Sequence, residues 1–228
     1  MITYKSHKFN NLTEKIKEIL LNNNINTNDF EPNLPNSVIN EIQLYVSSLL
    51  ASHNEFLSTT CPKCGKPHLE PFLSNYQRNI IFRIGNVLVN IKLLIPRVKC
   101  SNCHSTHALL PDFCVPLKQY SNQAIISIAT EAIQTSTDVV AENLNIDSKQ
   151  VRRFVNIVKS NKNHILLIYH KYLEFFKLKS SLILFFVDII SNIPKNFNEL
   201  FFLEFKFIFL YDIKIKRKLY MQYSKLSI

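Results

Sequence analysis

Two Cys-x-x-Cys pairs constrain the fold of this chain more than any other feature of its sequence. Cys61 and Cys64 form the first pair, and Cys100 and Cys103 form the second. Four thiolates offered in two pairs suit a tetrahedral zinc ion, which favours sulfur ligands and has a closed ligand shell in structural sites. We therefore predict that these four cysteines hold a structural zinc ion.

The 35 residues between the pairs (65–99) have the pattern of a β-hairpin. Residues 79–84 resemble a strand, Gly85-Asn86 suits a two-residue turn, and apolar side chains alternate along residues 87–94. Gly65 and Gly85 are the two glycines of the chain, and both lie where backbone freedom is most useful. The pattern indicates a zinc ribbon, in which hairpins carry the cysteines and the metal substitutes for a large core.

Other roles for the cysteines and nearby histidines remain as alternatives. A redox Cys-x-x-Cys motif is expected beside a βαβ unit, which the sequence does not indicate. A catalytic zinc ion would keep an open position and usually use His or carboxylate ligands. His68, His104 and His107 are close enough in sequence for one to replace a cysteine, although surface or outer-sphere positions suit them too. Cys114 is left over and is predicted to be an ordinary buried thiol.

The net charge of +10 is concentrated after the first cysteine pair. Residues 1–60 contain 4 Lys/Arg against 6 Asp/Glu, whereas residues 61–164 contain 13 against 6. Such a field attracts polyanions, nucleic acid first and an anionic membrane surface second. A soluble basic protein without such a partner is the alternative.

A predicted three-helix segment follows the cysteine pairs. Ser121 can cap a first helix, residues 139–144 suit a short second one, and Ser148 can cap a third. Asn145 lies in the tight connection, where glycine is often found, and asparagine also tolerates a left-handed conformation. This pattern indicates a helix-turn-helix, which places the start of its last helix in the DNA major groove.

The third helix separates apolar from basic side chains. Val151, Phe154, Val155 and Val158 share one face. Arginine can read guanine and glutamine can read adenine. The predicted DNA-binding residues lie mostly on the other face: Lys149, Gln150, Arg152, Arg153 and Asn156. Arg83, Arg97 and Lys99 of the β-hairpin are expected to add phosphate contacts. For the predicted helix-turn-helix, the alternative is an ordinary pair of helices whose basic face is exposed to solvent.

The fold class is predicted as α+β, with a zinc-ribbon β-hairpin followed by a helix-turn-helix. We expect a helical lead-in over residues 1–57, the ribbon over 58–116, the helix-turn-helix over 117–162 and an apolar, basic extension over 163–228. The lead-in is broken by an asparagine-rich loop, residues 22–28, as its composition indicates.

No catalytic constellation stands out, so the chain is predicted not to be an enzyme. The runner-up is a partial transposase nuclease using Asp188, with Glu204 and Asp212 as partners in a two-metal site. About 40 residues follow Asp188, which is too few for the rest of such a domain.

A cytoplasmic location is expected. The first residues lack the apolar run of a signal peptide, and a reducing compartment favours metal over disulfide for the cysteine pairs. No stretch reaches the length of about 18 apolar residues that a membrane helix needs, so no membrane partner is expected.

Residues 61–159 resemble the N-terminal zinc-ribbon and helix-turn-helix module of bacterial insertion-sequence transposases, and a family of short uncharacterised proteins that lack the nuclease domain. The resemblance is carried by Cys61-Pro62-Lys63-Cys64-Gly65, by residues 97–103 and above all by residues 105–113. It implies zinc, recognition of terminal repeats or other DNA, and an origin in mobile DNA. DNA is therefore the expected partner, and a homodimer or a protein partner docked on the ribbon remain as alternatives.

Overall fold

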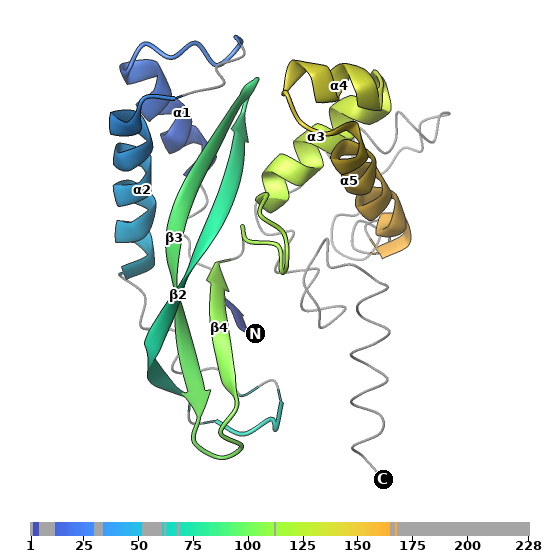
Figure 1. Cartoon of the computed structure of the whole chain (residues 1–228). Helices are drawn as coiled ribbons and strands as arrows, with labels where there is room; N and C mark the ends of the chain where they lie inside the picture. Colours follow the sequence, from blue (N-terminus) through green and yellow to red (C-terminus); the bar gives the residue numbers. More distant parts are fainter. Residues whose placement is uncertain are drawn as a thin grey trace. The chain divides into compact units, whose positions relative to one another are not determined.

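A long β-hairpin frames the first part of the molecule (Figure 1). The computed structural model describes residues 2–4, 12–29, 34–51, 61, 63–67, 69–111, 113–164 and 167. The chain divides into two compact units, residues 1–124 and 125–228. In the first unit, β2 (Leu69–Ile84) pairs antiparallel with β3 (Val87–Cys100). The predicted hairpin is thus confirmed, and both strands extend beyond the predicted residues 79–84 and 87–94.

The turn of this hairpin lies at Gly85-Asn86, as predicted. Of these two residues only Gly85 has a positive φ, +59°, which is the pattern of a type II′ turn. The turn also docks on the loop after α1, because Asn86 N donates to the carbonyl oxygen of Thr27 at 2.8 Å. A Cβ atom at Gly85 would overlap that same carbonyl oxygen, so glycine is required here for space as well as for φ.

Two further strands complete a four-stranded sheet in the order β1-β4-β3-β2. β4 (Thr106–Pro111) runs antiparallel to β3, and β1 (Ile2–Tyr4) runs parallel to β4. With the helices described below, this sheet confirms the α+β fold class.

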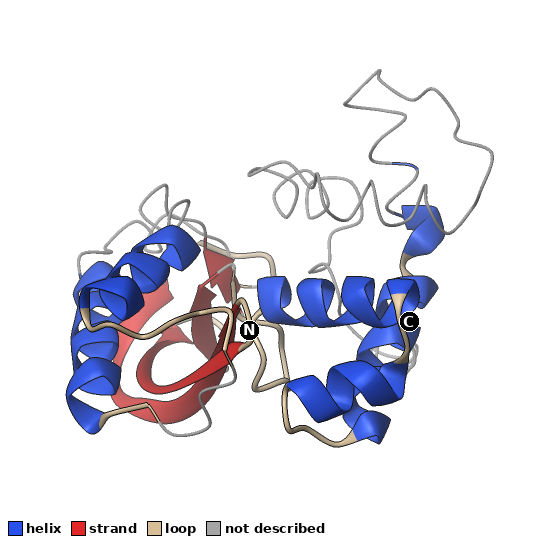
Figure 2. Ribbon diagram, turned by 90° about the horizontal axis from the view of Figure 1, so that it is seen from above, coloured by secondary structure: helices blue, strands red, loops and turns tan. Residues whose placement is uncertain are grey.

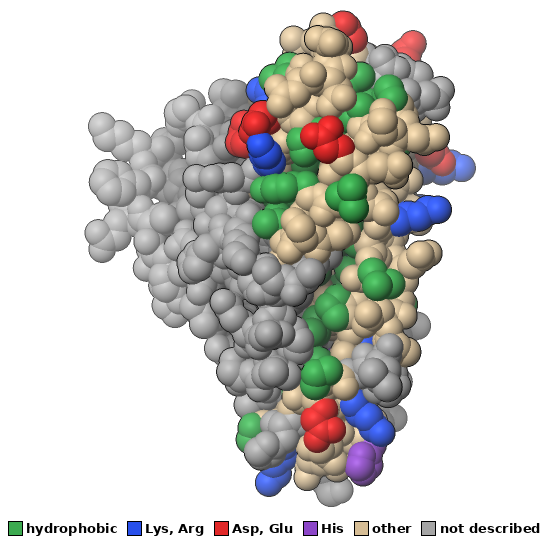
Figure 3. Space-filling view, turned by 90° about the vertical axis from the view of Figure 1, so that its left-hand side faces the viewer, with side chains coloured by type: hydrophobic (Ala, Val, Ile, Leu, Met, Phe, Trp, Pro, Cys, Tyr) green, Lys and Arg blue, Asp and Glu red, His purple; other side chains and the backbone are tan. Residues whose placement is uncertain are grey.

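Helices α1 (Leu12–Asn22) and α2 (Asn36–Ala51) pack along one side of the curved sheet (Figure 2). Alternate residues of β3, from Val87 to Ile95, are buried, and they share one core with the apolar faces of both helices. The segment predicted as a lead-in is therefore part of the first unit. On the side of α1 and α2, the described hydrophobic side chains form separate small groups between polar ones (Figure 3).

The buried side of β3 changes after Ile95, in the last third of the strand. Every second residue is buried from Val87 to Ile95. The next buried residues are Val98 and Cys100, which belong to the opposite set of alternate positions. The partner strand has an irregularity at the same level, between Phe72 and Tyr76. Because successive side chains of a strand point to opposite faces, the end of β3 that carries Cys100 turns its buried side away from the helices. Along its edge, this end of β3 pairs with β4.

The segment after β4 is fixed to the free edge of β2. Ile81 N donates to the carbonyl oxygen of Gln119 at 2.8 Å, and Ser121 N donates to that of Ile81 at 2.9 Å. Ser121 Oγ then accepts from Ala124 N, which caps α3 (Asn122–Gln134) as predicted. Cys114 is fully buried beside this segment, as expected.

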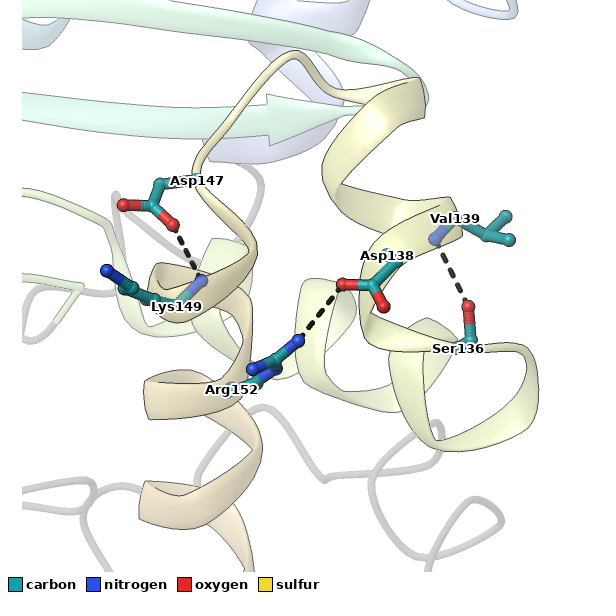
Figure 4. A network of polar contacts seen from close by, with 6 residues as sticks. All are labelled: Ser136, Asp138, Val139, Asp147, Lys149 and Arg152. Atoms are coloured by element: carbon teal, nitrogen blue, oxygen red, sulfur yellow. Dashed lines mark hydrogen bonds and ion pairs between the residues drawn. The ribbon is translucent and has the colours of Figure 1, made fainter.

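The second unit contains the rest of α3, α4 (Thr137–Asn143) and α5 (Ser148–Ser160). Ser136 caps α4 by accepting from Val139 N at 3.1 Å. The cap of α5 is Asp147, whose Oδ1 accepts from Lys149 N at 2.7 Å (Figure 4), so the prediction of Ser148 as the cap was wrong by one residue. A carboxylate satisfies a free N–H and also interacts favourably with the positive end of the helix dipole, which explains the choice of Asp147.

The connection between α4 and α5 is a tight helix ending with Asn145 at φ +48°. Ile146 N donates to Ala141 O at 2.9 Å, and Asn145 N donates to Glu142 O at 3.1 Å. These are the two hydrogen bonds of a Schellman motif, in which the left-handed position is usually glycine. Asn24 has the same role after α1, with φ +58°. Asparagine thus replaces glycine at two helix ends of a glycine-poor chain.

Among the described helices, none combines the length and apolar character needed to cross a lipid bilayer.

Candidate metal centre and basic helix

The four predicted cysteines converge at the end of the hairpin. Their Sγ atoms all lie within 4.8 Å of one another. Between the two pairs, the Sγ atoms of Cys61 and Cys103 are 3.6 Å apart, and those of Cys64 and Cys100 are 3.7 Å apart. A tetrahedral thiolate site with metal–sulfur bonds of about 2.3 Å has sulfur–sulfur distances of about 3.8 Å. The donor set and its spacing therefore fit a structural metal ion.

The loops around the two pairs, residues 61–65 and 100–104, have the same local geometry, and we call them the first and second knuckle. Gly65 N donates to Cys61 O at 2.8 Å, and His104 N donates to Cys100 O at 2.9 Å. The residue after the second cysteine is left-handed in both knuckles, with φ +68° at Gly65 and +56° at His104. The second knuckle thus accommodates a histidine where the first uses glycine.

Backbone N–H groups point at the first sulfur of each knuckle. Burial raises the pKa of the Cys61 thiol, but the N–H groups of Cys64 and Lys63 stabilise its thiolate, and the resulting pKa lies below the ordinary value. The N–H of Cys103 acts in the same direction on Cys100, yet burial and the thiols of Cys103 and Cys64 raise the pKa of Cys100 to about 11. The cluster thus favours the thiolate of Cys61 but opposes ionisation of Cys100, and a divalent cation would offset the repulsion between neighbouring thiolates.

Two side chains outside the cluster contact its sulfur atoms. The Ser105 hydroxyl lies 2.8 Å from Cys103 Sγ. This hydroxyl and the Ser105 N–H lower the pKa of Cys103 to about 6. His107 is buried on β4, with Nε2 at 3.2 Å from Cys61 Sγ and 3.1 Å from Ser105 Oγ. Such outer contacts orient metal ligands.

Of the three histidines near the cysteine pairs, His107 contacts the cluster. His107 lies beside a cluster that four cysteines already form, which is the geometry of an outer partner. Burial lowers the pKa of its imidazole. His104 is exposed, and His68 lies outside the described residues.

Helix α5 separates its apolar and basic faces as expected. Val151, Phe154 and Val158 are fully buried and Val155 is nearly so. The predicted DNA-binding residues lie outside this core, with Gln150 half-buried and the others exposed: Lys149, Arg152, Arg153 and Asn156. Exposed Lys159 extends the same face and was missed, although its spacing of seven residues from Arg152 places it there.

An acidic residue borders the basic face. Asp138, in the first turn of α4, places Oδ1 3.3 Å from Nη2 of Arg152 (Figure 4). The role of Asp138 is not evident from the sequence, because the spacing within either helix does not show which residues meet across the two helices. Both side chains remain largely exposed, at 72% for Asp138 and 57% for Arg152.

The hairpin arginines have partners within the sheet. Arg97 donates to Ser74 Oγ at 3.1 Å and to Thr106 Oγ1 at 2.9 Å, and Arg83 Nε donates to Gly85 O at 2.8 Å. Lys99 is half-buried. These hydrogen bonds fix both arginine side chains to the hairpin and its neighbouring strand.

The acidic residues of the nuclease alternative, Asp188, Glu204 and Asp212, lie outside the described residues.

Residues 61–154 match the model of a family described as a domain of unknown function, DUF6431. The matched segment begins at the first cysteine of the metal centre and ends within α5, so it contains all four cysteines and the Asp138–Arg152 pair. Comparison with curated proteins and with solved structures found no match.

Proposed function

We propose that this chain is a zinc-stabilised DNA-binding protein related to the N-terminal modules of insertion-sequence transposases. The observation that carries the proposal is the exposed basic face of α5, which begins directly after the tight connection from α4. Two helices joined in this way are typical of a helix-turn-helix, whose last helix enters the major groove.

Zinc has a structural role in this proposal. Cys61, Cys64, Cys100 and Cys103 would supply all four ligands, which leaves no open position for a reacting group. The ion would join two knuckles that are separated by the whole hairpin, and it would neutralise the charge that the backbone N–H groups stabilise on the thiolates. Its binding free energy is then part of the folding free energy of the first unit.

Helix α5 has the charge distribution that a polyanion requires. Its 13 residues, SKQVRRFVNIVKS, include four Lys or Arg and no Asp or Glu. Lys149, Gln150, Arg152 and Arg153 lie in the first half of the helix, which is the part that meets base edges in a helix-turn-helix. Asn156 and Lys159 would extend the contact along the DNA backbone.

A cytoplasmic location and an origin in mobile DNA belong to the same proposal. A reducing compartment keeps cysteine pairs available for metal. The origin in mobile DNA rests on the resemblance of residues 61–159 to the transposase modules.

The test is binding of the zinc-loaded full chain to a fluorescent random-sequence DNA duplex, titrated with salt. Release of counterions should make the affinity fall steeply as salt rises. Arg152→Ala/Arg153→Ala should lower the affinity at least about tenfold and reduce the salt slope by at least about 1. The matched control is Lys17→Ala/Lys92→Ala, which removes two exposed lysines of the first unit.

The control should retain the affinity of the wild type to within about threefold, because both lysines lie outside α5 and an exposed charge that does not contact the DNA is screened by salt. An equal loss in both double variants would show that net charge alone, and not α5, governs binding. If the folded, zinc-loaded wild type does not bind the duplex at low salt, the DNA-binding proposal fails and docking to a protein becomes the leading alternative.

A further inference from the structure

The Asp138–Arg152 pair lies at the edge of the basic face of α5, where α4 meets it (Figure 4). The carboxylate belongs to the first turn of α4 and the guanidinium to the second turn of α5. Their closest atoms are 3.3 Å apart, and most of both side chains remains open to solvent. An acidic group therefore stands against the surface that the proposed function assigns to a polyanion.

Stability does not account well for this placement. An exposed ion pair contributes about 0–1 kcal/mol to stability, and salt screens it further. Asp138 can also favour α4 through the helix dipole, but Ser136 already caps that helix. A contribution of this kind does not need the carboxylate to meet Arg152.

On a surface that binds DNA, such a carboxylate would act in two ways. A carboxylate on the binding face repels phosphate, so it lowers the affinity for DNA of every sequence. It also holds one N–H edge of the Arg152 guanidinium, which has five donors in a rigid fork. The donors that remain suit the two acceptors of a guanine edge in the major groove.

We propose that Asp138 is a specificity-determining residue of the DNA-binding surface on α5. It weakens sequence-independent attraction and positions Arg152 for a base contact, so that tight binding depends on the correct base. Specificity of this kind combines a repulsive element with an attractive one. The inference rests on the proposed function, since it concerns the same surface.

The neighbouring basic residues have a different role in this account. Among the described residues, the side chains of Lys149 and Arg153 have no carboxylate partner within ion-pair distance. Both lie on the exposed face of α5 and are suited to phosphate contacts. Of the described basic residues of α5, Arg152 is the one paired with an acidic residue of another helix.

The experiment compares Asp138→Asn with Glu142→Gln in the zinc-loaded full chain. Glu142 is an exposed carboxylate of the same helix, so its substitution removes the same charge without the contact to Arg152. The probes are a random-sequence duplex and the duplex that the wild type enriches from that random pool. Both affinities are measured at several salt concentrations, and thermal unfolding is recorded for each variant.

Asp138→Asn is expected to bind the random duplex about threefold more tightly at low salt, with a salt slope steeper by up to about 1. Its preference for the enriched duplex should fall about tenfold, which is the scale of one base contact. Glu142→Gln should keep the preference of the wild type. Asp138→Glu, which retains the charge, should stay closer to the wild type than Asp138→Asn.

Equal preferences in Asp138→Asn and Glu142→Gln would overturn the role of Asp138 while leaving DNA binding intact. A lower unfolding temperature of Asp138→Asn with an unchanged preference would likewise assign the carboxylate to the stability of α4 alone. Absence of binding by the wild type would instead refute the proposed function, and this inference with it.

Discussion

The sulfur atoms of Cys61 and Cys103 lie 3.6 Å apart, although 42 positions separate the two residues along the chain. The whole hairpin of β2 and β3 lies between them, and its strand pairing brings its ends together. Each knuckle adds a second cysteine at the same place. A metal ion bound here would therefore link the segment before β2 to the end of β3.

The first prediction concerns the metal. The purified full chain should contain about one zinc ion per chain, because the cluster offers one tetrahedral set of ligands. Cys103→Ser should lose most of this zinc and lose ordered structure at the hairpin end. The matched control is Cys114→Ser, since Cys114 is buried but lies outside the cluster. Elemental analysis and circular dichroism are the measurements, and equal zinc contents in the two variants would contradict the assignment.

The second prediction concerns Ser105. Its hydroxyl and N–H hold the pKa of Cys103 down to about 6, so Ser105→Ala should raise that pKa. The folded-state pKa is lowered, so the associated stability is present above the ordinary thiol pKa and is lost as pH falls through about 6. In the zinc-free wild type, thiolate absorbance should therefore appear at lower pH than in Ser105→Ala.

Zinc retention against a chelator gives an independent measure of the same contact. Loss of an outer partner typically weakens metal binding about 10–100-fold. Unchanged thiolate titration and unchanged zinc retention in Ser105→Ala would show that the hydroxyl does not act on Cys103.

The third prediction compares the two glycines, which both have positive φ. Gly65→Ala meets no atom within 4 Å and should cost about 1 kcal/mol, the strain of a left-handed residue with a side chain. Gly85→Ala carries the same strain and must also displace the carbonyl of Thr27, so it should cost about 2 kcal/mol or more. Denaturant unfolding measures both. A Gly65→Ala loss as large as that of Gly85→Ala would argue against the docking of the turn on the α1 loop.

The fourth prediction separates the two candidate caps of α5. Asp147→Ala should destabilise the helix by about 1 kcal/mol, because Oδ1 no longer accepts from Lys149 N. Ser148→Ala should have little effect, since Ser148 is already the first helical residue. Amide hydrogen exchange of α5 would distinguish them, and the reverse order of effects would restore Ser148 as the cap.

Local patterns in the sequence predicted much of this structure. The turn at Gly85, the alternation along β3 and the two faces of α5 all follow from residue type and period, so they were correct. The choice of Asp147 over Ser148 was missed because both residues are good caps and lie side by side. Long-range pairings were harder to foresee, such as β1 added parallel to β4 or the turn docked on Thr27, because they depend on packing between distant segments.

At the candidate site too, the sequence predicted the local pattern but not the contacts between distant segments. Cysteine spacing identified the four thiols that converge, because tetrahedral metal sites use a small set of ligand patterns. The arrangement of His107 and Ser105 around them depends on where β4 lies against β3, which spacing does not specify. The contact of Asp138 with Arg152 depends in the same way on the packing of α4 against α5.

Selection from a random pool of DNA duplexes tests the central claim most directly. The zinc-loaded full chain and Arg152→Ala/Arg153→Ala would be carried through the same selection in parallel. We expect the wild type to enrich a defined sequence motif and the double variant to enrich none, because the proposal assigns a base contact to Arg152 and a phosphate contact to Arg153. Enrichment of the same motif by both proteins, or of no motif by either, would contradict sequence-specific DNA recognition by α5.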